Sequence, residues 1–267
     1  MSQARGRQAE AGLAASVRRH DPDRFLATLF APPAKRGALL ALIAFNHELA
    51  RAREATSEPH LALIRLQWWR DTIEGEARRH EVATPLRAGL DTGLLHRGDL
   101  LAMIDAREAE AEPAIETLDA WLDYLRGTAG GLAVASGRLL GAPEPEALRP
   151  FGTAYGIAGV LRSVPLLARQ QRCLLPRDVL ATHGLSPEAV IAAPASEPVL
   201  RAMASLAAEG RTLLEQARRT RVPRSAIAAA LPAVLARRDL ARPPPYPAWR
   251  GLGDRLAVAC AGLAGRI

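Results

Sequence analysis

Cysteine is nearly absent from this sequence, which contains only Cys173 and Cys260. Two cysteines so far apart make neither a disulfide framework nor the closely spaced pairs of a structural zinc site. The six histidines are dispersed as well, and none is paired at the spacing of a zinc motif. The sequence therefore argues against a disulfide-stapled secreted domain and against a zinc protein.

Long apolar runs and strand-like patterns are missing too. No uncharged apolar stretch of about 18 residues occurs, and the N-terminus has no signal-peptide core, so by default we expect a cytoplasmic protein whose membrane contact would be peripheral, at the inner membrane face. Valine and isoleucine are sparse, whereas alanine and leucine dominate a chain that is 49% apolar. We predict an all-α protein, with a polar segment at residues 1–20 that is frayed or forms a short helix and one helical domain at residues 21–267.

Lysine is the other scarce residue, because Lys35 is the only one and arginine carries almost all of the positive charge behind the net charge of +7. The arginine pairs are scattered, at residues 18–19, 78–79, 218–219 and 237–238, and no basic segment is interleaved with aromatic residues. A nucleic-acid-binding module is therefore not expected. A weak attraction to an anionic bilayer surface fits the charge better.

Residues 37–54, GALLALIAFNHELARARE, form the segment around which we expect the chain to pack. Apolar residues recur at helical spacing from Leu39 to Leu49, which predicts a helix with one buried face. Its last two turns instead carry polar and charged side chains, including His47 and Glu54. Trp68 and Trp69, in the following segment, are expected to belong to the core rather than to a cofactor site.

Capping and turn residues divide the remainder into helices. Asp21 followed by Pro22 is typical of a helix N-terminus, and Pro32 and Pro33 separate that helix from the next. Further helices are predicted near residues 59–75, 84–95, 98–112, 113–140, 146–168, 187–192, 196–220, 223–238 and 254–267, with a loop at 169–186 and a stiff proline-rich connection at 242–249.

The helix at residues 37–54 resembles a site helix of the squalene and phytoene synthases, the head-to-head prenyl synthase family. In that family it reads A-F-C-R-x-x-D-D-x-x-D, and its aspartates hold magnesium against the substrate diphosphate. Phe45 keeps the pattern, and Glu54 keeps the last acid. Four positions depart from the family pattern. Where the family has Cys, Arg and the aspartate pair, this sequence has Asn46, His47, Ala50 and Arg51.

The stretch GTAYGIAGVLRSVPLL (152–167), followed by RCLLP (172–176), resembles the second site helix, G-x-A-x-Q-x-x-N-x-x-R-D-x-x-x-D, and the R-x-Y-L-P after it. The matching positions are Gly152, Ala154, Leu161, Arg162, Arg172, Leu175 and Pro176. Gly156, Gly159, Ser163 and Leu167 stand where the family has Gln, Asn and the two Asp. Tyr124, Ala129 and Gly130 match a further family pattern, Y-x-x-x-x-A-G. The resemblance, over about residues 21–180, implies a single-domain isoprenoid synthase-like bundle around a central cavity.

Magnesium does not suit the residues at these positions. Carboxylates spaced i and i+4 on two facing helices would hold Mg²⁺, which needs hard oxygen ligands. The first helix offers Glu54 beside Arg51 and Arg53, and the second offers no acid. Arg51 opposes a cation, because two like charges about 5 Å apart repel by roughly 3 kcal/mol at an effective dielectric of about 20. We therefore predict no metal ligands and no cofactor.

Other residues resemble a non-catalytic branch of the family that includes a mitochondrial complex I assembly factor and bacterial relatives. They are Asn46, Glu48, Leu49, Ala50, Ser57, Glu58, Gln67 and the run from Tyr155 to Arg162. This resemblance implies an assembly factor or an isoprenoid- or lipid-binding protein, with respiratory-complex subunits as partners. The aromatic residues, four Trp, three Tyr and four Phe, are also few for a cavity that stabilises carbocations.

The alternative is a divergent prenyl transferase that condenses farnesyl or geranylgeranyl diphosphate with Mg²⁺ and draws its acids from elsewhere. Asp119 and Asp123 are candidates, since they are spaced i and i+4. They flank Trp121 and Leu122, however, and we therefore expect them on a solvated face.

An anion can also be held without metal, because guanidinium groups bind phosphates directly. An isoprenoid phosphate or an anionic lipid headgroup would then occupy the cavity with its tail between helices. No catalytic residue is predicted, and the candidate ligand-binding residues are His47, Arg51, Glu54, Tyr155, Arg162, Ser163 and Arg172. In the competing interpretation, which we favour on the sequence alone, Arg51 pairs with His47, Glu48 or Glu54 and plugs the cavity.

Overall fold

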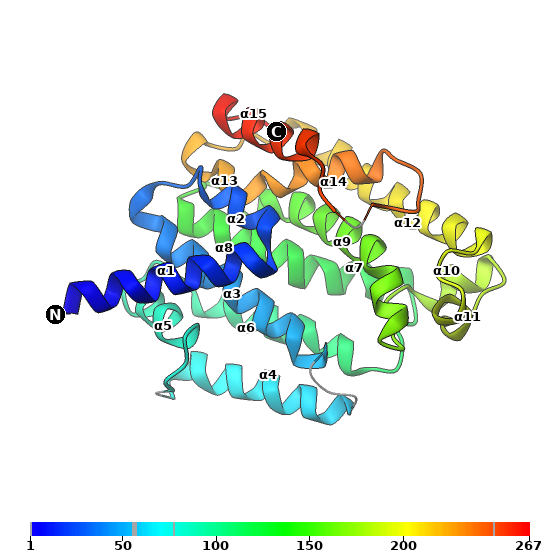
Figure 1. Ribbon diagram of the computed structural model, residues 1–267, viewed down its shortest axis with the longest axis horizontal. Coiled ribbons are helices and arrows are strands. Elements are labelled where there is room, and N and C mark those ends of the chain that lie inside the picture. Colours follow the sequence, from blue (N-terminus) through cyan, green and yellow to red (C-terminus); the bar gives the residue numbers. More distant parts are fainter. Residues whose placement is uncertain (1, 55–57, 77, 248) are drawn as a thin grey trace.

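The computed structural model describes residues 2–54, 58–76, 78–247 and 249–267, without the side chains of residues 2–9 and Glu54. Every regular element in these ranges is helical, which confirms the all-α prediction. Figure 1 shows α8 and α9 in the middle of the molecule, α1 crossing in front of them, α4 along the lower edge, and α13, α14 and α15 along the upper edge.

The first half of the described chain contains six α-helices and a single turn of 3₁₀ helix. They are α1 (Ser2–His20), α2 (Pro22–Thr28), α3 (Pro33–Glu54), α4 (Pro59–Glu74), α5 (Ala83–Asp91), α6 (Arg97–Arg107) and η1 (Glu108–Ala111). The second half contains α7 (Leu118–Leu125), the π-helical segment η2 (Arg126–Gly130), α8 (Gly131–Leu140), η3 (Pro145–Leu148), α9 (Arg149–Arg169), α10 (Arg177–Thr182), α11 (Pro187–Ala192), α12 (Glu197–Gln216), η4 (Ala217–Arg219), η5 (Arg224–Ala226), α13 (Ile227–Ala230), α14 (Pro232–Leu240) and α15 (Leu252–Ala264).

The N-terminal segment is a full helix, which differs from the frayed or short one expected for residues 1–20. Leu13 and Val17 lie one helical turn apart and are both buried, and α1 packs on α3. The amphipathic spacing of these two residues therefore anchors α1 to the core, and its last turn extends as far as the cavity described below.

Helix α3 lies in the core, as its apolar spacing predicts. Leu42, Phe45 and Leu49 are almost fully buried, and the Phe45 ring contacts Trp69 of α4 edge-on, with 5.2 Å between centroids. At the preceding helix, Asp21 accepts a hydrogen bond from the backbone N–H of Arg24 at 2.9 Å. The predicted cap of α2 is therefore confirmed.

The helix predicted for residues 113–140 begins later, at Leu118, where the Thr117 hydroxyl caps it by accepting the N–H of Ala120. From there α7, η2 and α8 form one continuous helix. At Gly152 of α9, an added Cβ would lie 2.4 Å from the carbonyl oxygen of Ala129 in η2. Only glycine permits this approach of α9 to η2.

The last third of the chain covers α9 from the other side. Helices α12 and α14 pack on α9, and α15 packs on α14 and α2. One prediction was wrong here, because the expected loop at residues 169–186 contains α10. Pro176 stands directly before this helix and Asp178 lies in its first turn, and both residues favour a helix start at these positions.

One helical stretch is long and apolar enough to cross a membrane by length and composition, Pro145–Arg169, which includes α9. Within the fold, 61% of its apolar window is buried. This burial is what the central helix of a protein core shows.

Candidate functional site

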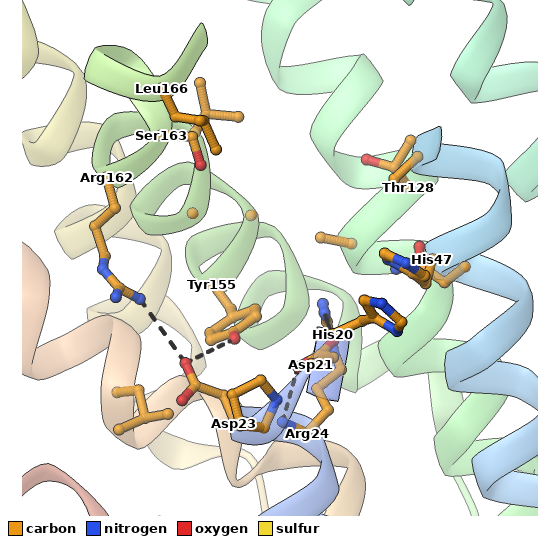
Figure 2. A pocket seen from close by; sticks show the side chains of 18 of the residues that line it. His20, Asp21, Asp23, Arg24, His47, Thr128, Tyr155, Arg162, Ser163 and Leu166 are labelled. Atoms are coloured by element: carbon orange, nitrogen blue, oxygen red, sulfur yellow. Dashed lines mark hydrogen bonds and ion pairs between the residues drawn. The ribbon is translucent and has the colours of Figure 1, made fainter. Parts of the chain in front are cut away.

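A cavity of about 920 Å³ opens between the end of α1 and α2 on one side and α3, α7, η2 and α9 on the others. Figure 2 shows its wall, with Tyr155, Arg162, Ser163 and Leu166 along α9 and with His47 and Thr128 facing them. Residues after α14 complete the wall, since Trp249, Arg250 and Arg255 also line the cavity. The cavity is large enough for an extended organic ligand of the size that protein pockets commonly bind.

The two helix faces singled out by sequence lie across this cavity. Ala50 of α3 lines one wall, and Gly159, Ser163 and Leu167 of α9 line another. The periodicity of an α-helix explains the arrangement, because residues three or four apart project from the same side. At Gly159 an added Cβ would meet no heavy atom within 4 Å, so this position borders open space.

Five predicted site residues line the cavity, and they come from α3, from α9 and from the segment after α9: His47, Tyr155, Arg162, Ser163 and Arg172. Arg51 does not line it. Its side chain is 52% exposed and donates to Glu48 at 3.2 Å, next to a separate shallow pocket against α4. The expected pairing of Arg51 with Glu48 is therefore confirmed. The expected plug is wrong, because this pair lies outside the cavity. The side chain of Glu54 lies outside the described part of the structure.

At one end of the cavity, Arg250 binds two carboxylates. Its Nε donates to Asp23 Oδ2 at 2.9 Å, and its Nη1 lies 2.7 Å from both carboxylate oxygens of Asp239. Arg162 joins the cluster, with nitrogens 3.8 Å from Asp23 and 3.9 Å from Asp239. Asp239 is fully buried and Arg250 is nearly so. We call these four residues the aspartate cluster.

Tyr155 connects the aspartate cluster to the cavity floor. Its hydroxyl donates to Asp23 Oδ2 at 3.1 Å, an interaction drawn as a dashed line in Figure 2. Burial, together with the charges of Asp21 and Asp23, raises the pKa of this hydroxyl well above its ordinary value. The Arg24 guanidinium lies 4.6 Å from the centre of the ring. The Tyr155 hydroxyl therefore stays protonated, and its hydrogen bond to Asp23 fixes its position.

Another wall of the cavity holds a second set of buried charges around Glu110. Its carboxylate accepts hydrogen bonds from Arg107, from Arg172 at 2.8 Å and from the Tyr124 hydroxyl at 2.8 Å. Burial alone would raise the pKa of Glu110. The charges of Arg107 and Arg172 nevertheless hold this pKa below its usual range. Burial and the Glu110 charge raise the pKa of Tyr124. We call these four residues the glutamate cluster.

His47 stacks on His20 of α1 at the rim, with 4.5 Å between ring centroids. Burial and the neighbouring His20 lower the pKa of His47, which favours its neutral form. Its Nε2 atom is buried and has no hydrogen-bond partner among the described residues. Asp21 lies beside this pair and is held by Arg24 at 2.8 Å.

The cavity wall is strongly basic. Among its described residues, eight are arginines and three are carboxylates. All three carboxylates, Asp21, Asp23 and Glu110, bind arginine side chains. Three of the arginines, Arg18, Arg19 and Arg255, form no ion pair with any described residue.

The side chains of this wall do not fit a cluster of magnesium ions. Magnesium would need carboxylate oxygens as ligands, and those of the wall already bind arginine. No group of three or more His, Cys, Asp or Glu side chains in the described ranges is arranged to hold a metal ion. Asp119 and Asp123 are exposed, as expected, and Asp123 pairs with Arg126 at 2.8 Å.

Sequence reasoning missed most of the charged wall. Asp23 and Arg250 are 227 positions apart, and Glu110 and Arg172 are 62 apart. No local spacing joins such residues. The available signals were family matches: Arg162 and Arg172 were predicted as site residues and belong to the two clusters, and Tyr124, which matched a further family pattern, donates to Glu110.

The all-helical bundle and its central cavity define a protein of the isoprenoid synthase class. More narrowly, the chain belongs to the squalene/phytoene synthase family, whose model matches residues 17–245. The resemblance stated from residues 37–54 and 152–176 is thereby confirmed.

Similar curated proteins fall into two groups. The complex I assembly factor 6 homolog of Drosophila melanogaster is 32% identical over 188 residues, 66% of this chain and 56% of that protein. Human complex I assembly factor 6 is 28% identical over 180 residues, 64% of this chain and 54% of that protein. Presqualene diphosphate synthase of Sinorhizobium fredii is 27% identical over 177 residues, 60% of this chain and 61% of that protein. The match thus spans little more than half the length of these two assembly factors.

Solved structures agree on the fold. A ligand-bound dehydrosqualene synthase superposes with a TM-score of 0.78 at 16% identity, over 97% of this chain and 96% of that one. A squalene synthase from Alicyclobacillus acidocaldarius gives a TM-score of 0.70 at 19% identity, over 97% and 95%. At such identities, the likeness shows the fold alone.

Proposed function

We propose that this chain is a non-catalytic member of its family that binds an isoprenoid phosphate or an anionic lipid headgroup in the cavity without magnesium. The charge of the cavity wall is the observation that carries this proposal. Eight arginines face three carboxylates there, and each carboxylate binds arginine. A phosphate would therefore meet donors, and a magnesium ion would meet few free oxygens.

The positions that the family resemblance assigns to magnesium ligands support the same proposal. Ala50, Ser163 and Leu167 line the cavity with a methyl, a hydroxyl and an apolar side chain. The phosphate end of a ligand would bind near Arg18, Arg19 and Arg255, whose charges form no ion pair with a described residue. The tail would lie against apolar wall residues such as Val160 and Leu167.

Calorimetric titration with farnesyl diphosphate tests the proposal directly. We expect binding in the presence of EDTA, with an affinity that Mg²⁺ does not increase. The double variant Arg18→Gln/Arg19→Gln should bind about fivefold to tenfold more weakly, because two partly exposed charge contacts are worth about 0.5 kcal/mol or more each. A titration with a phosphatidic acid of short chain length distinguishes the lipid headgroup from the isoprenoid.

The matched control is Arg218→Gln/Arg219→Gln, which removes the same charge from an exposed turn that does not line the cavity. If this control weakens binding equally, the attraction is non-specific and the proposal fails. Absence of binding in EDTA also contradicts it.

The prenyl transferase alternative predicts a different result. Presqualene diphosphate synthases are among the matching proteins, and such an enzyme would bind farnesyl diphosphate in a magnesium-dependent manner. Incubation with radiolabelled farnesyl and geranylgeranyl diphosphate in Mg²⁺, followed by thin-layer chromatography, measures turnover. A condensation product that disappears in the Arg162→Gln variant would overturn the non-catalytic assignment.

We also propose a role in assembling a respiratory complex, on the support of the relatives named as complex I assembly factor 6. Crosslinking in native cells, followed by affinity purification, should enrich respiratory-complex subunits over a control bait of equal charge. Recovery of the chain alone, with or without lipid, would contradict this role and leave the ligand proposal untouched.

A further inference from the structure

An exposed apolar surface lies beside the cavity mouth. Trp249 is 86% exposed, Leu252 73%, Leu256 54% and Leu263 68%. We call these four residues the C-terminal patch. The three leucines occupy one face of α15, since steps of four and eleven residues return to nearly the same side of an α-helix.

The C-terminal patch is exposed to solvent because α15 packs on the protein through its opposite face. Asp254, Val258 and Gly262 are buried, and α15 packs on α14 and α2 through that face. The helix is therefore anchored on one side and apolar on the other. Scattered single leucines on a surface are ordinary, but four large apolar side chains along one short segment indicate a binding surface.

The charge around the patch is of one sign. Within residues 249–267, the only acid is Asp254, which is buried and binds Arg238 at 2.7 Å and Arg242 at 3.2 Å. The exposed charged residues of this segment are Arg255 and Arg266. An apolar helix face flanked by a tryptophan and by arginines is complementary to the headgroup region of an anionic bilayer.

The patch is also continuous with the cavity. Trp249 and Arg255 line the cavity, and so does Leu166 of α9, which is 54% exposed. If a bilayer contacts the C-terminal patch, its lipid acyl chains lie opposite the cavity opening. In Figure 1 α15 lies at the upper edge, far from α4 at the lower edge.

We propose that the C-terminal patch docks the protein on an anionic lipid bilayer, with Trp249 and the α15 leucines in the headgroup region and the cavity mouth facing the membrane. This surface goes beyond the proposed cavity ligand. Vesicles free of isoprenoids test docking alone, so a failure of docking and a failure of diphosphate binding in solution are distinguishable.

Co-sedimentation with vesicles is the test. The protein should bind vesicles of phosphatidylcholine mixed with phosphatidylglycerol, and bind those of phosphatidylcholine alone weakly. The triple variant Leu252→Gln/Leu256→Gln/Leu263→Gln should lower the partition coefficient by about tenfold or more, since it removes apolar contact area without changing charge. The matched control carries three glutamines on α4, Leu61→Gln/Leu63→Gln/Ile64→Gln, and should bind like the wild type.

Tryptophan fluorescence gives a second readout that reports orientation. Trp69 and Trp121 are buried and Trp68 is partly buried, so a blue shift on vesicle binding should come from Trp249 and disappear in Trp249→Phe. No binding to anionic vesicles, or equal loss in the α4 control, would overturn the proposal. A concentration-dependent dimer that the α15 variant abolishes, without vesicle binding, would assign the patch to a second copy of the chain instead.

Discussion

The two buried charge clusters of the cavity wall differ in their balance. The aspartate cluster pairs Asp23 and Asp239 with Arg162 and Arg250, two charges of each sign. The glutamate cluster sets the single charge of Glu110 against Arg107 and Arg172. Among these named residues, the first cluster holds equal numbers of positive and negative charges, whereas in the second two arginines share one carboxylate.

This difference bears on how much each arginine stabilises the fold. The aspartate cluster joins α2, α9, α14 and the segment before α15, so its ion pairs hold the cavity wall together. In the glutamate cluster, two arginines share one carboxylate, so the loss of one of them still leaves Glu110 with a cationic partner. Substitutions that remove one arginine from each cluster should therefore have unequal effects on stability.

The largest effect is expected for Arg250→Gln. This change leaves Asp23 and Asp239 with Arg162 alone at 3.8 to 3.9 Å, and breaking a buried pair on one side costs about 3 kcal/mol or more. The free energy of unfolding should fall by about that amount in urea denaturation. The neighbouring Arg255→Gln, at an exposed position, serves as control and should cost under about 0.5 kcal/mol. Equal losses in the two variants would remove the structural role assigned to the aspartate cluster.

Acidification should act on the glutamate cluster. Because the pKa of Glu110 is lower in the folded protein than in the unfolded chain, its ion pairs stabilise the fold above the unfolded pKa, about 4.3. That stability is lost as the pH falls through the folded-state pKa. The difference in unfolding free energy between wild type and Glu110→Gln should therefore shrink as the pH falls from 6 through the unfolded-state pKa and on through the folded-state pKa. A constant difference over this range would contradict the lowered pKa.

The smallest effect is expected for Arg172→Gln. Glu110 would keep Arg107 and the Tyr124 hydroxyl, so the free energy of unfolding should fall by only about 1 kcal/mol. The same denaturation experiment gives the comparison, and Arg172→Lys should restore part of the loss. A cost as large as that of Arg250→Gln would show that Arg107 cannot hold the Glu110 carboxylate without Arg172.

Sequence predicted most of the helices and which residues share a helix face, because both follow from local periodicity. The 3.6-residue repeat placed Gly159 and Ser163 on one face of their helix, whereas the expectation that this face and that of Ala50 share a cavity came from the family resemblance. The same repeat did not decide whether the Arg51 side chain enters the cavity. Arg51 follows Ala50 by one residue and therefore lies about 100° around α3. Its side chain points out of the cavity and pairs with Glu48.

Ion pairs between residues far apart in the sequence could not be predicted, for a physical reason. An arginine and an aspartate attract at any sequence separation, and only the packing of whole helices decides which pair meets. Arg250 follows a proline-rich connection whose path the sequence does not define, and Asp239 lies one residue beyond the helix predicted for residues 223–238, although α14 includes it. Helix α10 was missed although α11, which is equally short, was predicted. The N-cap Ser186 before Pro187 gave the clearer start signal for α11, whereas α10 begins after Pro176 without a side-chain cap.

Arg250 has a consequence for the order of events during synthesis. Its contact with Asp23 joins residues 227 positions apart, so the wall around Tyr155 is finished only after residue 250 has been made. Until then, the buried carboxylate of Asp239 has no Arg250 to neutralise it. A nascent chain that stalls before residue 250 therefore exposes an incomplete pocket to chaperones and proteases.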